Sequence, residues 1–264
     1  MFRVDRLVKY LQEKAPLAVA FSGGVDSALL LLAARKALGE NVVAITARMD
    51  SFPERELSET KKICKELGAK HIICSVEQLD NDEFVKNCPD RCYICKKMIF
   101  QAIIKAVRAE GIQYIAEGSN ADDVSDYRPG LKAVDELGII SPLKDCGYTK
   151  EDIRRLAQEH GLSVWDKPAY ACLATRIPYN DEITKEKLVM IDKAEEHIMS
   201  YGIRQVRVRV HDNIARIEVN PDSFPVLLDE KNRADIIAEL KQLGFLYVTL
   251  DIGGFKSGSM NYNI

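Results

Sequence analysis

The sequence lacks a long hydrophobic run. No stretch approaches the roughly 18 consecutive apolar residues that a membrane-spanning helix requires. The N-terminal segment carries charged residues at short intervals, whereas a signal peptide has an uninterrupted apolar core. We therefore expect a mature N-terminus, no membrane partner and a cytoplasmic location.

The sequence also lacks an excess of basic residues. Its 37 lysines and arginines are balanced by 40 aspartates and glutamates, which gives a formal net charge of −3 at pH 7. Proteins that bind nucleic acids over a large surface are usually basic, so we expect no nucleic acid partner, although a local basic patch is compatible with this balance. Hydrophobic residues make up 47% of the chain, which excludes a disordered protein.

Cysteine, in contrast, is abundant for a protein without an export signal. The odd number of seven cysteines argues against a disulfide framework. Three of them fall within residues 88–95, and this cluster indicates metal or redox chemistry in a reducing compartment. We expect Cys64, Cys74 and Cys146 to be packing residues, the usual role of a free cysteine.

Strand-like and helix-like patterns alternate in the first part of the chain. Strands are predicted at residues 17–21, 42–46, 71–76 and 114–118. Helices are predicted at residues 26–38, 54–67, 96–110 and 149–161. This alternation is typical of an α/β fold with a doubly wound parallel sheet, in which ligands bind at the carboxyl ends of the strands.

The pattern changes near residue 180, after a proline-punctuated connecting loop at 165–179. The remaining chain predicts, in order, a helix, two strands, a helix and a strand, at 184–201, 204–211, 214–219, 230–243 and 245–251. Helices and antiparallel strands in this order indicate a smaller α+β domain of ferredoxin-like type. We therefore predict two domains, residues 1–180 and residues 181–264.

The motif SGGVDS follows the first predicted strand and opens the first helix. Gly23 and Gly24 allow the backbone to turn tightly and to approach an anion. The helix start offers N–H groups and a positive dipole end, and Ser22 and Ser27 add hydroxyl donors. Because Asp26 would repel a bare phosphate, we expect it to orient the ligand or to contact a bridging Mg²⁺. The motif is neither a Walker A loop nor a dinucleotide loop, and a plain turn is its alternative interpretation.

This motif resembles the loop of the PP-loop ATP pyrophosphatases. Members of that superfamily cleave ATP between the α- and β-phosphates, adenylate a substrate and hold pyrophosphate on the loop. The later run EGSNADD, at 117–123, resembles their second signature. The resemblance implies that Gly118, Asp122 and Asp123 lie near the nucleotide and Mg²⁺, although an acidic pair of this kind can also be an exposed helix cap.

Three further segments narrow the resemblance. They are ACLATRIPY at 171–179, DRCYICKK at 90–97, and a C-terminal region with RVR at 207–209 and GSMN at 258–261. Together with the loop they resemble the LarE family, sulfur transferases that help to make the nickel-pincer nucleotide cofactor of lactate racemase. The resemblance covers nearly the whole chain, and the segment CLATR is its most specific part.

The resemblance implies a reaction in two stages. ATP first adenylates a pyridinium carboxylate of a nicotinate-derived mononucleotide and releases pyrophosphate. A sulfur nucleophile then displaces AMP and leaves a thiocarboxylate, a sound route because the carboxylate itself is a poor electrophile. In one branch of the family, the cysteine that matches Cys172 gives up its own sulfur and becomes dehydroalanine.

A second branch carries a [4Fe–4S] cluster on three cysteines, with one iron open to hold a sulfide for transfer. Because this chain has additional thiols at Cys92 and Cys95, we predict Cys92, Cys95 and Cys172 as the cluster ligands. Three other interpretations stay open. Cys88 could replace Cys172 as the third cluster ligand, and the spacing from Cys88 to Cys95 also occurs in the cluster motif of radical-SAM enzymes. The thiolate pair could instead bind a structural zinc ion. The source of the sulfide is not predicted.

Charged residues complete the predicted site. Arg207 and Arg209 alternate on a predicted strand and so share one face, where two guanidiniums suit the phosphate of the substrate. A solvated strand face with ion pairs is the alternative. We expect Arg176 and Lys96 to be partners of the ATP phosphates or of the adenylate. Glu196, on the preceding helix, is predicted to orient the substrate or to act as a base.

Other functions share parts of this pattern. A tRNA thiolase uses the same adenylation and often three cysteines, but the net charge of −3 disfavours it. An amide-forming PP-loop ligase would have no use for Cys172, and a metal-storage or scaffold protein would not need an intact phosphate loop. The LarE resemblance also implies a homo-oligomer.

Overall fold

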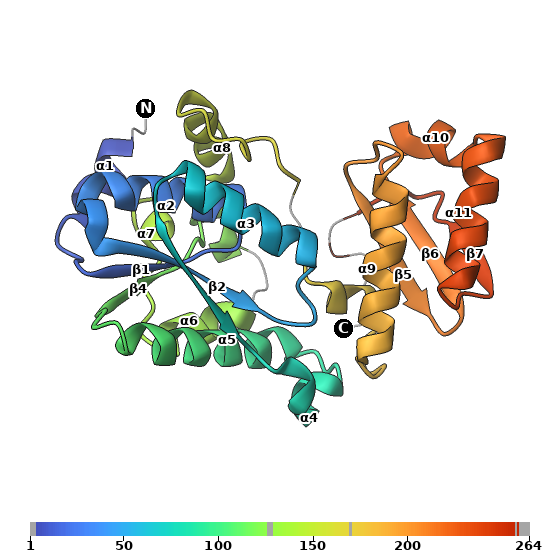
Figure 1. Cartoon of the computed structure of the whole chain (residues 1–264), viewed down its shortest axis with the longest axis horizontal. Coiled ribbons are helices and arrows are strands. Elements are labelled where there is room, and N and C mark those ends of the chain that lie inside the picture. The colour runs from blue at the N-terminus through green and yellow to red at the C-terminus, as the bar shows by residue number, and fades with distance from the viewer. Residues whose placement is uncertain (1–3, 126–128, 169–170, 257, 259–264) are drawn as a thin grey trace. The chain divides into compact units, whose positions relative to one another are not determined.

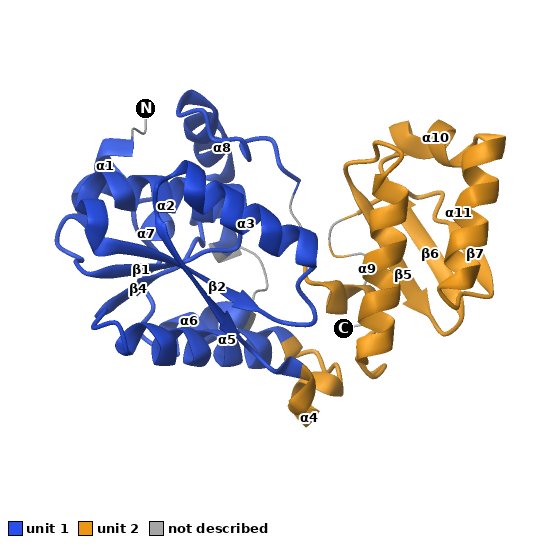
Figure 2. Cartoon of the chain, in the orientation of Figure 1, with its two compact units in different colours: residues 1–78, 92–170 blue, residues 79–91, 171–264 orange. Residues whose placement is uncertain are grey.

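The computed structural model describes residues 4–125, 129–168, 171–256 and 258 (Figure 1). The chain divides into two compact units (Figure 2). Unit 1 comprises residues 1–78 and 92–170, and unit 2 comprises residues 79–91 and 171–264. The short segment 79–91 therefore groups with the C-terminal part of the chain, whereas the predicted domains at 1–180 and 181–264 remain a prediction. Of the helices within the described ranges, none is long and apolar enough to cross a membrane.

Unit 1 is built on a four-stranded parallel sheet. Its strands are β1 (Leu17–Ala20), β2 (Val42–Arg48), β3 (Lys70–Ser75) and β4 (Tyr114–Ala116), in the order β3-β2-β1-β4. Every pairing in this sheet is parallel, which confirms the predicted doubly wound α/β fold. The strand order reverses between β1 and β4, and in open sheets ligands bind at the carboxyl ends beside such a reversal.

Helices cover both faces of this sheet (Figure 1). They are α1 (Val4–Leu11), α2 (Val25–Leu38), α3 (Glu54–Glu66), α5 (Arg91–Arg108), α6 (Pro129–Glu136), α7 (Pro142–Asp145) and α8 (Lys150–Glu159). Successive strand residues point to opposite faces. Leu17 and Val19 accordingly pack in one core cluster with α1, α2 and α8, whereas Ala18 packs in a second cluster with α5 and α6.

Unit 2 is a smaller α+β unit, as predicted. It contains α4 (Asp82–Val85), a short 3₁₀ helix (Leu173–Arg176), α9 (Lys185–Met199), β5 (Val206–His211), β6 (Ile214–Val219), α10 (Phe224–Leu228), α11 (Glu230–Gln242) and β7 (Tyr247–Leu250). The strand order is β5-β6-β7. Strand β6 is antiparallel to β5 but parallel to β7. The expected antiparallel pairing is confirmed for β5 and β6. It is wrong for β7, because α11 returns the chain so that β7 runs in the direction of β6.

Two local differences bear on the site. Helix α5 begins at Arg91 rather than at residue 96, so Cys92 and Cys95 lie in its first turn. Because cysteine and tyrosine have only modest helix propensity, the sequence does not indicate that the helix begins this early. The expected loop at 165–179 contains the 3₁₀ helix Leu173–Arg176, which directly follows Cys172.

Candidate functional site

Unit 1 contains a cavity of about 600 Å³ at the carboxyl ends of β1, β2 and β4. Its apolar lining includes Ile45, Ala47, Met49, Phe52, Ile99, Phe100 and Ile103. Its polar lining includes seven residues predicted to bind ATP and Mg²⁺, namely Ser22, Asp26, Ser27, Lys96, Gly118, Asp122 and Asp123. A cavity of this size and mixed lining suits a ligand that combines a flat ring with charged groups.

The phosphate loop owes its shape to Gly23. This residue has a φ of +74°, which favours glycine, and a Cβ there would lie 3.0 Å from Thr60 Cγ2 of α3. The hydroxyls of Ser22 and Ser27 are 3.2 Å apart, and Ser27 Oγ donates to the carbonyl of Gly24 at 3.1 Å. The loop is thus held across its own turn and leads directly into α2.

Lys167 holds the same loop from another side. Its ammonium group donates to the Gly23 carbonyl at 3.4 Å and to Glu56 Oε2 at 2.8 Å, and it also pairs with Glu59. Burial opposes the charge of this lysine, but the hydrogen bonds with the two carboxylates outweigh it and raise the pKa of Lys167. The amino group therefore stays charged and ties the loop backbone to α3.

Asp26 is the meeting point of three segments. Its Oδ1 accepts from Asn120 Nδ2 at 3.1 Å, and its Oδ2 forms an ion pair with Lys150. The backbone N–H of Lys150 in turn donates to Asp122 Oδ2 at 2.8 Å. The loop after β1, the loop after β4 and the start of α8 are therefore joined at the carboxylate that the sequence predicts to contact Mg²⁺.

The run after β4 also lies against the start of α2. A Cβ on Gly118 would lie 3.1 Å from the backbone N of Ser27, which explains the glycine at this position. Asp123 is buried, and its Oδ2 accepts from the backbone N–H of Asn120 at 3.0 Å. Asp122 and Asp123 both line the cavity. Asp122 is nevertheless exposed and accepts from the first backbone N–H of α8, so it also has the contacts of a helix cap.

Glu117, at the start of the same run, accepts several hydrogen bonds. Its carboxylate accepts from the backbone N–H and hydroxyl of Ser119, at 3.0 and 2.8 Å, and from Ser141 Oγ at 2.6 Å. Lys96 Nζ lies 3.5 Å from the same carboxylate. This contact is the longest of these four, and the Lys96 side chain is partly exposed, so Lys96 can turn to a ligand phosphate.

The acidic residues of the cavity suit magnesium carried by a nucleotide. Among the described residues, no group of three or more His, Cys, Asp or Glu side chains could hold a metal ion by itself. Mg²⁺ is usually bound by one or two carboxylates together with substrate phosphates. Asp26 with the neighbouring Asp122 meets that requirement, so the donor set fits Mg²⁺ brought in with ATP.

Two of the predicted cluster ligands stand near this cavity in unit 1. Cys92 and Cys95 are three residues apart in the first turn of α5, which places them on one face of the helix. Cys92 is exposed, and Cys95 Sγ accepts from Gln78 Nε2 at 2.9 Å. The next residue, Lys96, lines the cavity. This thiol pair fits two ligand positions of an iron–sulfur cluster or of zinc.

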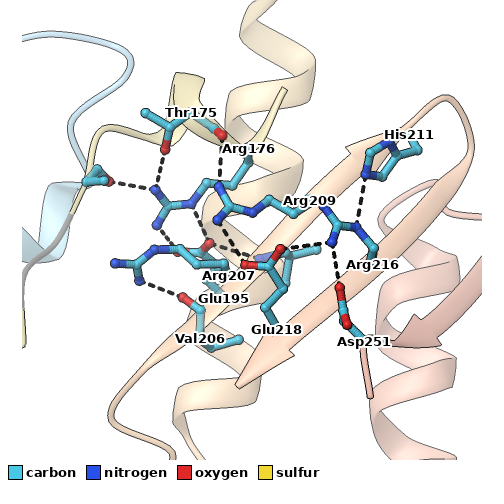
Figure 3. A network of polar contacts seen from close by, with 12 residues as sticks. Thr175, Arg176, Glu195, Val206, Arg207, Arg209, His211, Arg216, Glu218 and Asp251 are labelled. Carbon is cyan, nitrogen blue, oxygen red and sulfur yellow. Dashed lines mark hydrogen bonds and ion pairs between the residues drawn. The ribbon is translucent and has the colours of Figure 1, made fainter. Parts of the chain in front are cut away.

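The third predicted ligand, Cys172, belongs to unit 2. Arg176, only 1% exposed, forms a two-pronged ion pair with Glu195, at 2.8 and 3.0 Å (Figure 3). Its third nitrogen donates to the carbonyls of Ala171 and Cys172, at 2.8 and 3.1 Å. Arg176 therefore fixes the backbone around Cys172, while its predicted contact with ATP phosphates stays a prediction.

Sequence reasoning selected Glu196 and missed Glu195. In the structure Glu196 is exposed, whereas Glu195 is fully buried and also accepts from the backbone N–H of Val208 at 3.0 Å. Helical spacing could have shown this, because Glu195 lies on the same face of α9 as the buried Ile191 and Ile198. The role of Glu196 toward the substrate stays a prediction.

Arg207 and Arg209 are both buried, at 3% and 5% exposure, so they do not form a solvated strand face. Arg209 donates to Glu218 Oε2 and to the carbonyl of Thr175, each at 2.9 Å (Figure 3). Burial lowers the pKa of Arg209, although the bond with Glu218 opposes this effect. The guanidinium of Arg207 lies 5.1 Å from the centre of the Phe255 ring.

Arg216 extends this network on β6. It contacts Glu218 at 3.0 Å, Asp251 at 2.6 Å and the ring of His211 at 3.1 Å (Figure 3). In this network the guanidiniums of Arg176, Arg209 and Arg216 pair with the carboxylates of Glu195, Glu218 and Asp251.

The remaining cysteines have distinct surroundings. Cys64 and Cys146 are buried in the core cluster of unit 1, and burial raises the pKa of Cys64 to about 12. Cys88 belongs to unit 2, as Cys172 does. The adjacent Asn87 donates from its side chain to the carbonyl of Pro178 at 2.6 Å, which ties segment 79–91 into that unit.

Comparison with known proteins identifies the family. A family described as a PP-loop domain matches residues 2–127. The pyridinium-3,5-bisthiocarboxylic acid mononucleotide synthase of Lactiplantibacillus plantarum is 39% identical over 260 residues, which cover 97% of this chain and 92% of that protein. The chain belongs to the LarE family.

Two further relatives of this LarE protein match it over different shares of the chain. An uncharacterized protein of Synechocystis is 37% identical, with 98% of this chain and 97% of that protein covered. A tRNA-specific 2-thiouridylase of Rickettsia conorii is 24% identical, with 64% of this chain and 55% of that protein covered. The predicted class, an ATP-dependent sulfur-transferring enzyme with a PP-loop domain, is confirmed by these matches.

Some cavity residues escaped the sequence analysis. Lys150 and Asn120 both bind Asp26, yet neither stood out as a candidate. Asn120 lies inside the EGSNADD run, so its position in the sequence could have indicated that it belongs to the site. Lys150 is distant in sequence and is brought to the cavity only by the fold of α8.

Proposed function

We propose that this LarE protein adenylates the carboxylate of a nicotinate-derived pyridinium mononucleotide and converts it into a thiocarboxylate. One carboxylate oxygen attacks the α-phosphorus of ATP, and pyrophosphate leaves. A sulfur nucleophile then attacks the carbonyl carbon, and AMP leaves with the electron pair of the C–O bond. The match to the Lactiplantibacillus plantarum synthase over nearly the full length of both proteins carries this proposal.

The cavity of unit 1 supports the adenylation half. Its apolar lining residues fit the adenine ring, and the loop of Ser22, Gly23, Gly24 and Ser27 presents hydroxyl and N–H groups to the phosphates. Asp26 provides a carboxylate for Mg²⁺. The charge that develops on the leaving pyrophosphate would thus meet donors already held in place.

For the sulfur source we propose a [4Fe–4S] cluster held by Cys92, Cys95 and Cys172. Such a cluster, with three protein thiolates, supplies an open iron position that can hold a sulfide. The shared helix face of Cys92 and Cys95 supports this assignment. The alternative is direct donation by Cys172, in which its sulfur is transferred and dehydroalanine remains.

Unit 2 is proposed to bind the phosphate of the substrate. Arg207 and Arg209 are its candidate ligands, and their burial would exclude water from an ion pair with that phosphate. Arg176 would hold the backbone of Cys172 for the transfer step. Glu196 is retained as a candidate for orienting the substrate. A homo-oligomer and a cytoplasmic location complete the proposal.

The test uses the protein purified and reconstituted without oxygen. ATP, the carboxylated pyridinium mononucleotide and sulfide are added, and mass spectrometry follows thiocarboxylate while AMP and pyrophosphate are quantified. Product with equal amounts of AMP is expected. AMP formation that requires tRNA, and not the mononucleotide, would instead establish a tRNA thiolase, and absence of AMP with either substrate would overturn the adenylation step.

Iron and acid-labile sulfide content decide between the two sulfur sources. About four irons per chain are expected, with loss of iron in Cys92→Ala, Cys95→Ala and Cys172→Ala. The matched control is Cys88→Ala, which should keep its iron. Iron retained in Cys172→Ala but lost in Cys88→Ala would make Cys88 the third ligand. No iron in the parent protein, with loss of one H₂S from its mass after turnover, would establish direct donation by Cys172.

A further inference from the structure

Lys150 has a fixed backbone and a long side chain that reaches into the cavity. It is the first residue of α8, whose start is secured by a capping box between Thr149 and Asp152. Its backbone N–H donates to Asp122 Oδ2 at 2.8 Å. Its side chain is 35% exposed and forms the ion pair with Asp26. The backbone is therefore anchored, while the four-carbon stem allows the ammonium group to change position.

This ion pair occupies the carboxylate that Mg²⁺ needs. An oxygen of Asp26 that accepts a hydrogen bond from an ammonium group cannot at the same time serve a cation of higher charge without repulsion between the two cations. A triphosphate entering the cavity supplies negative oxygens close to Asp26, and these offer the ammonium group a second set of partners.

We propose that Lys150 exchanges partners when ATP binds. Without nucleotide its ammonium group neutralises Asp26. When ATP binds, the ammonium group moves to the phosphates and leaves this carboxylate to the accompanying Mg²⁺. Lys150 is then a phosphate-binding residue of the adenylation step that also prevents Asp26 from repelling the incoming nucleotide. This inference rests on one part of the proposed function, the binding of ATP with Mg²⁺ in the cavity.

Lys96 provides a contrast within the same cavity. Its ammonium group lies 3.5 Å from Glu117, whose carboxylate already accepts three shorter hydrogen bonds. Lys96 can therefore approach a phosphate without giving up a strong partner. Replacement of Lys96 should weaken ATP binding but should show no dependence on Asp26.

The first test measures, without nucleotide, the weak metal binding that the two carboxylates of Asp26 and Asp122 can provide by themselves, and it therefore uses millimolar metal. Mn²⁺ serves as a paramagnetic substitute for Mg²⁺, and its binding is followed by electron paramagnetic resonance in the parent protein, in Lys150→Met and in Lys132→Met, an exposed lysine outside the cavity. The exchange predicts that Lys150→Met binds Mn²⁺ about tenfold more tightly, since one competing charge-assisted bond is removed. Lys132→Met should match the parent. Equal or weaker Mn²⁺ binding by Lys150→Met overturns the proposal.

The second test measures movement with a double-mutant cycle. Calorimetry follows ATP binding in the presence of excess Mg²⁺ for the parent, Asp26→Asn, Lys150→Met and the double variant. If Lys150 exchanges partners, Lys150→Met should lower the ATP affinity about tenfold in the Asp26→Asn background, where only a phosphate contact is lost. In the parent background the loss should be several-fold smaller, because the substitution also removes the ion pair with Asp26 that ATP binding would otherwise have to break. Equal losses in both backgrounds mean that Lys150 does not leave Asp26.

Controls keep these outcomes interpretable. Lys150→Gln replaces Lys150→Met if the latter unfolds at a lower temperature than the parent. The same cycle with Lys96→Met in place of Lys150→Met should give equal losses in the two backgrounds. Both measurements record binding alone, so a failure of sulfur transfer to the mononucleotide would leave them unchanged and would be recognised separately.

Discussion

Replacing Glu195 by alanine should destabilise unit 2 by about 3–5 kcal/mol, the typical cost of leaving a buried charge without its partner. The structure supports a value in this range, because Arg176 and Glu195 are 1% and 0% exposed and water cannot replace the lost carboxylate. Three hydrogen bonds are removed together, two from Arg176 and one from the backbone N–H of Val208. The neighbouring Glu196 is exposed, so Glu196→Ala should change the stability by no more than about 0.5 kcal/mol.

Urea unfolding monitored by circular dichroism gives the free energy of unfolding, and hydrogen exchange locates the change in unit 2. A double variant separates the effect of the lost charge on stability from the effect of the lost packing. Arg176→Met combined with Glu195→Leu should regain most of the lost stability, since apolar pairs often replace buried ion pairs at little cost. A loss below about 1 kcal/mol in Glu195→Ala, the range of exposed ion pairs, would refute the reasoning. So would equal effects of Glu195→Ala and Glu196→Ala.

Further predictions concern both units. Cys172→Ala should abolish thiocarboxylate formation while pyrophosphate release continues, and product formed by this variant would remove Cys172 from the mechanism. Asp26→Ala should lose AMP formation by about 100-fold or more, as expected when a group at the reacting phosphates is removed, and normal AMP formation would contradict the phosphate-loop assignment. Lys167→Met should raise the KM for ATP and lower stability by about 2–4 kcal/mol, with partial rescue by arginine, because two carboxylates of α3 lose their cation. At pH 8, iodoacetamide followed by mass spectrometry should modify the exposed Cys92 in iron-free protein, whereas Cys64, with a pKa of about 12, should react only after unfolding.

The fold of unit 1 could be predicted because its strands are short apolar runs bounded by turns and helices. Alternate residues such as Leu17 and Ala18 face different helix layers, so both had to be apolar. The direction of β7 could not be predicted in the same way. Its residues have the same β propensity whether the strand pairs in parallel or antiparallel, and only the packing of α11 decides.

The phosphate loop was also accessible from the sequence, since glycine at positive φ and a helix start leave a local signature. Lys150 was not accessible, because its partner Asp26 is 124 residues away and a lone lysine at a helix start has no pattern of its own. Glu195 was accessible in principle, because helical spacing places it on the same face of α9 as the apolar Ile191 and Ile198. Its partners, Arg176 and the backbone N–H of Val208, could not be predicted, because only the tertiary fold brings them to that face.

The cysteines assigned to sulfur chemistry have one property that spacing alone does not reveal. Cys92 is the first residue after the chain returns to unit 1, and Cys172 is the second residue after it passes again to unit 2. Cys95 and Cys88 also lie within four residues of the passage at 91–92. None of these four cysteines is fully buried, so packing alone does not account for them. The buried Cys64 and Cys146, in contrast, lie within the core of unit 1, where shape and apolarity account for them.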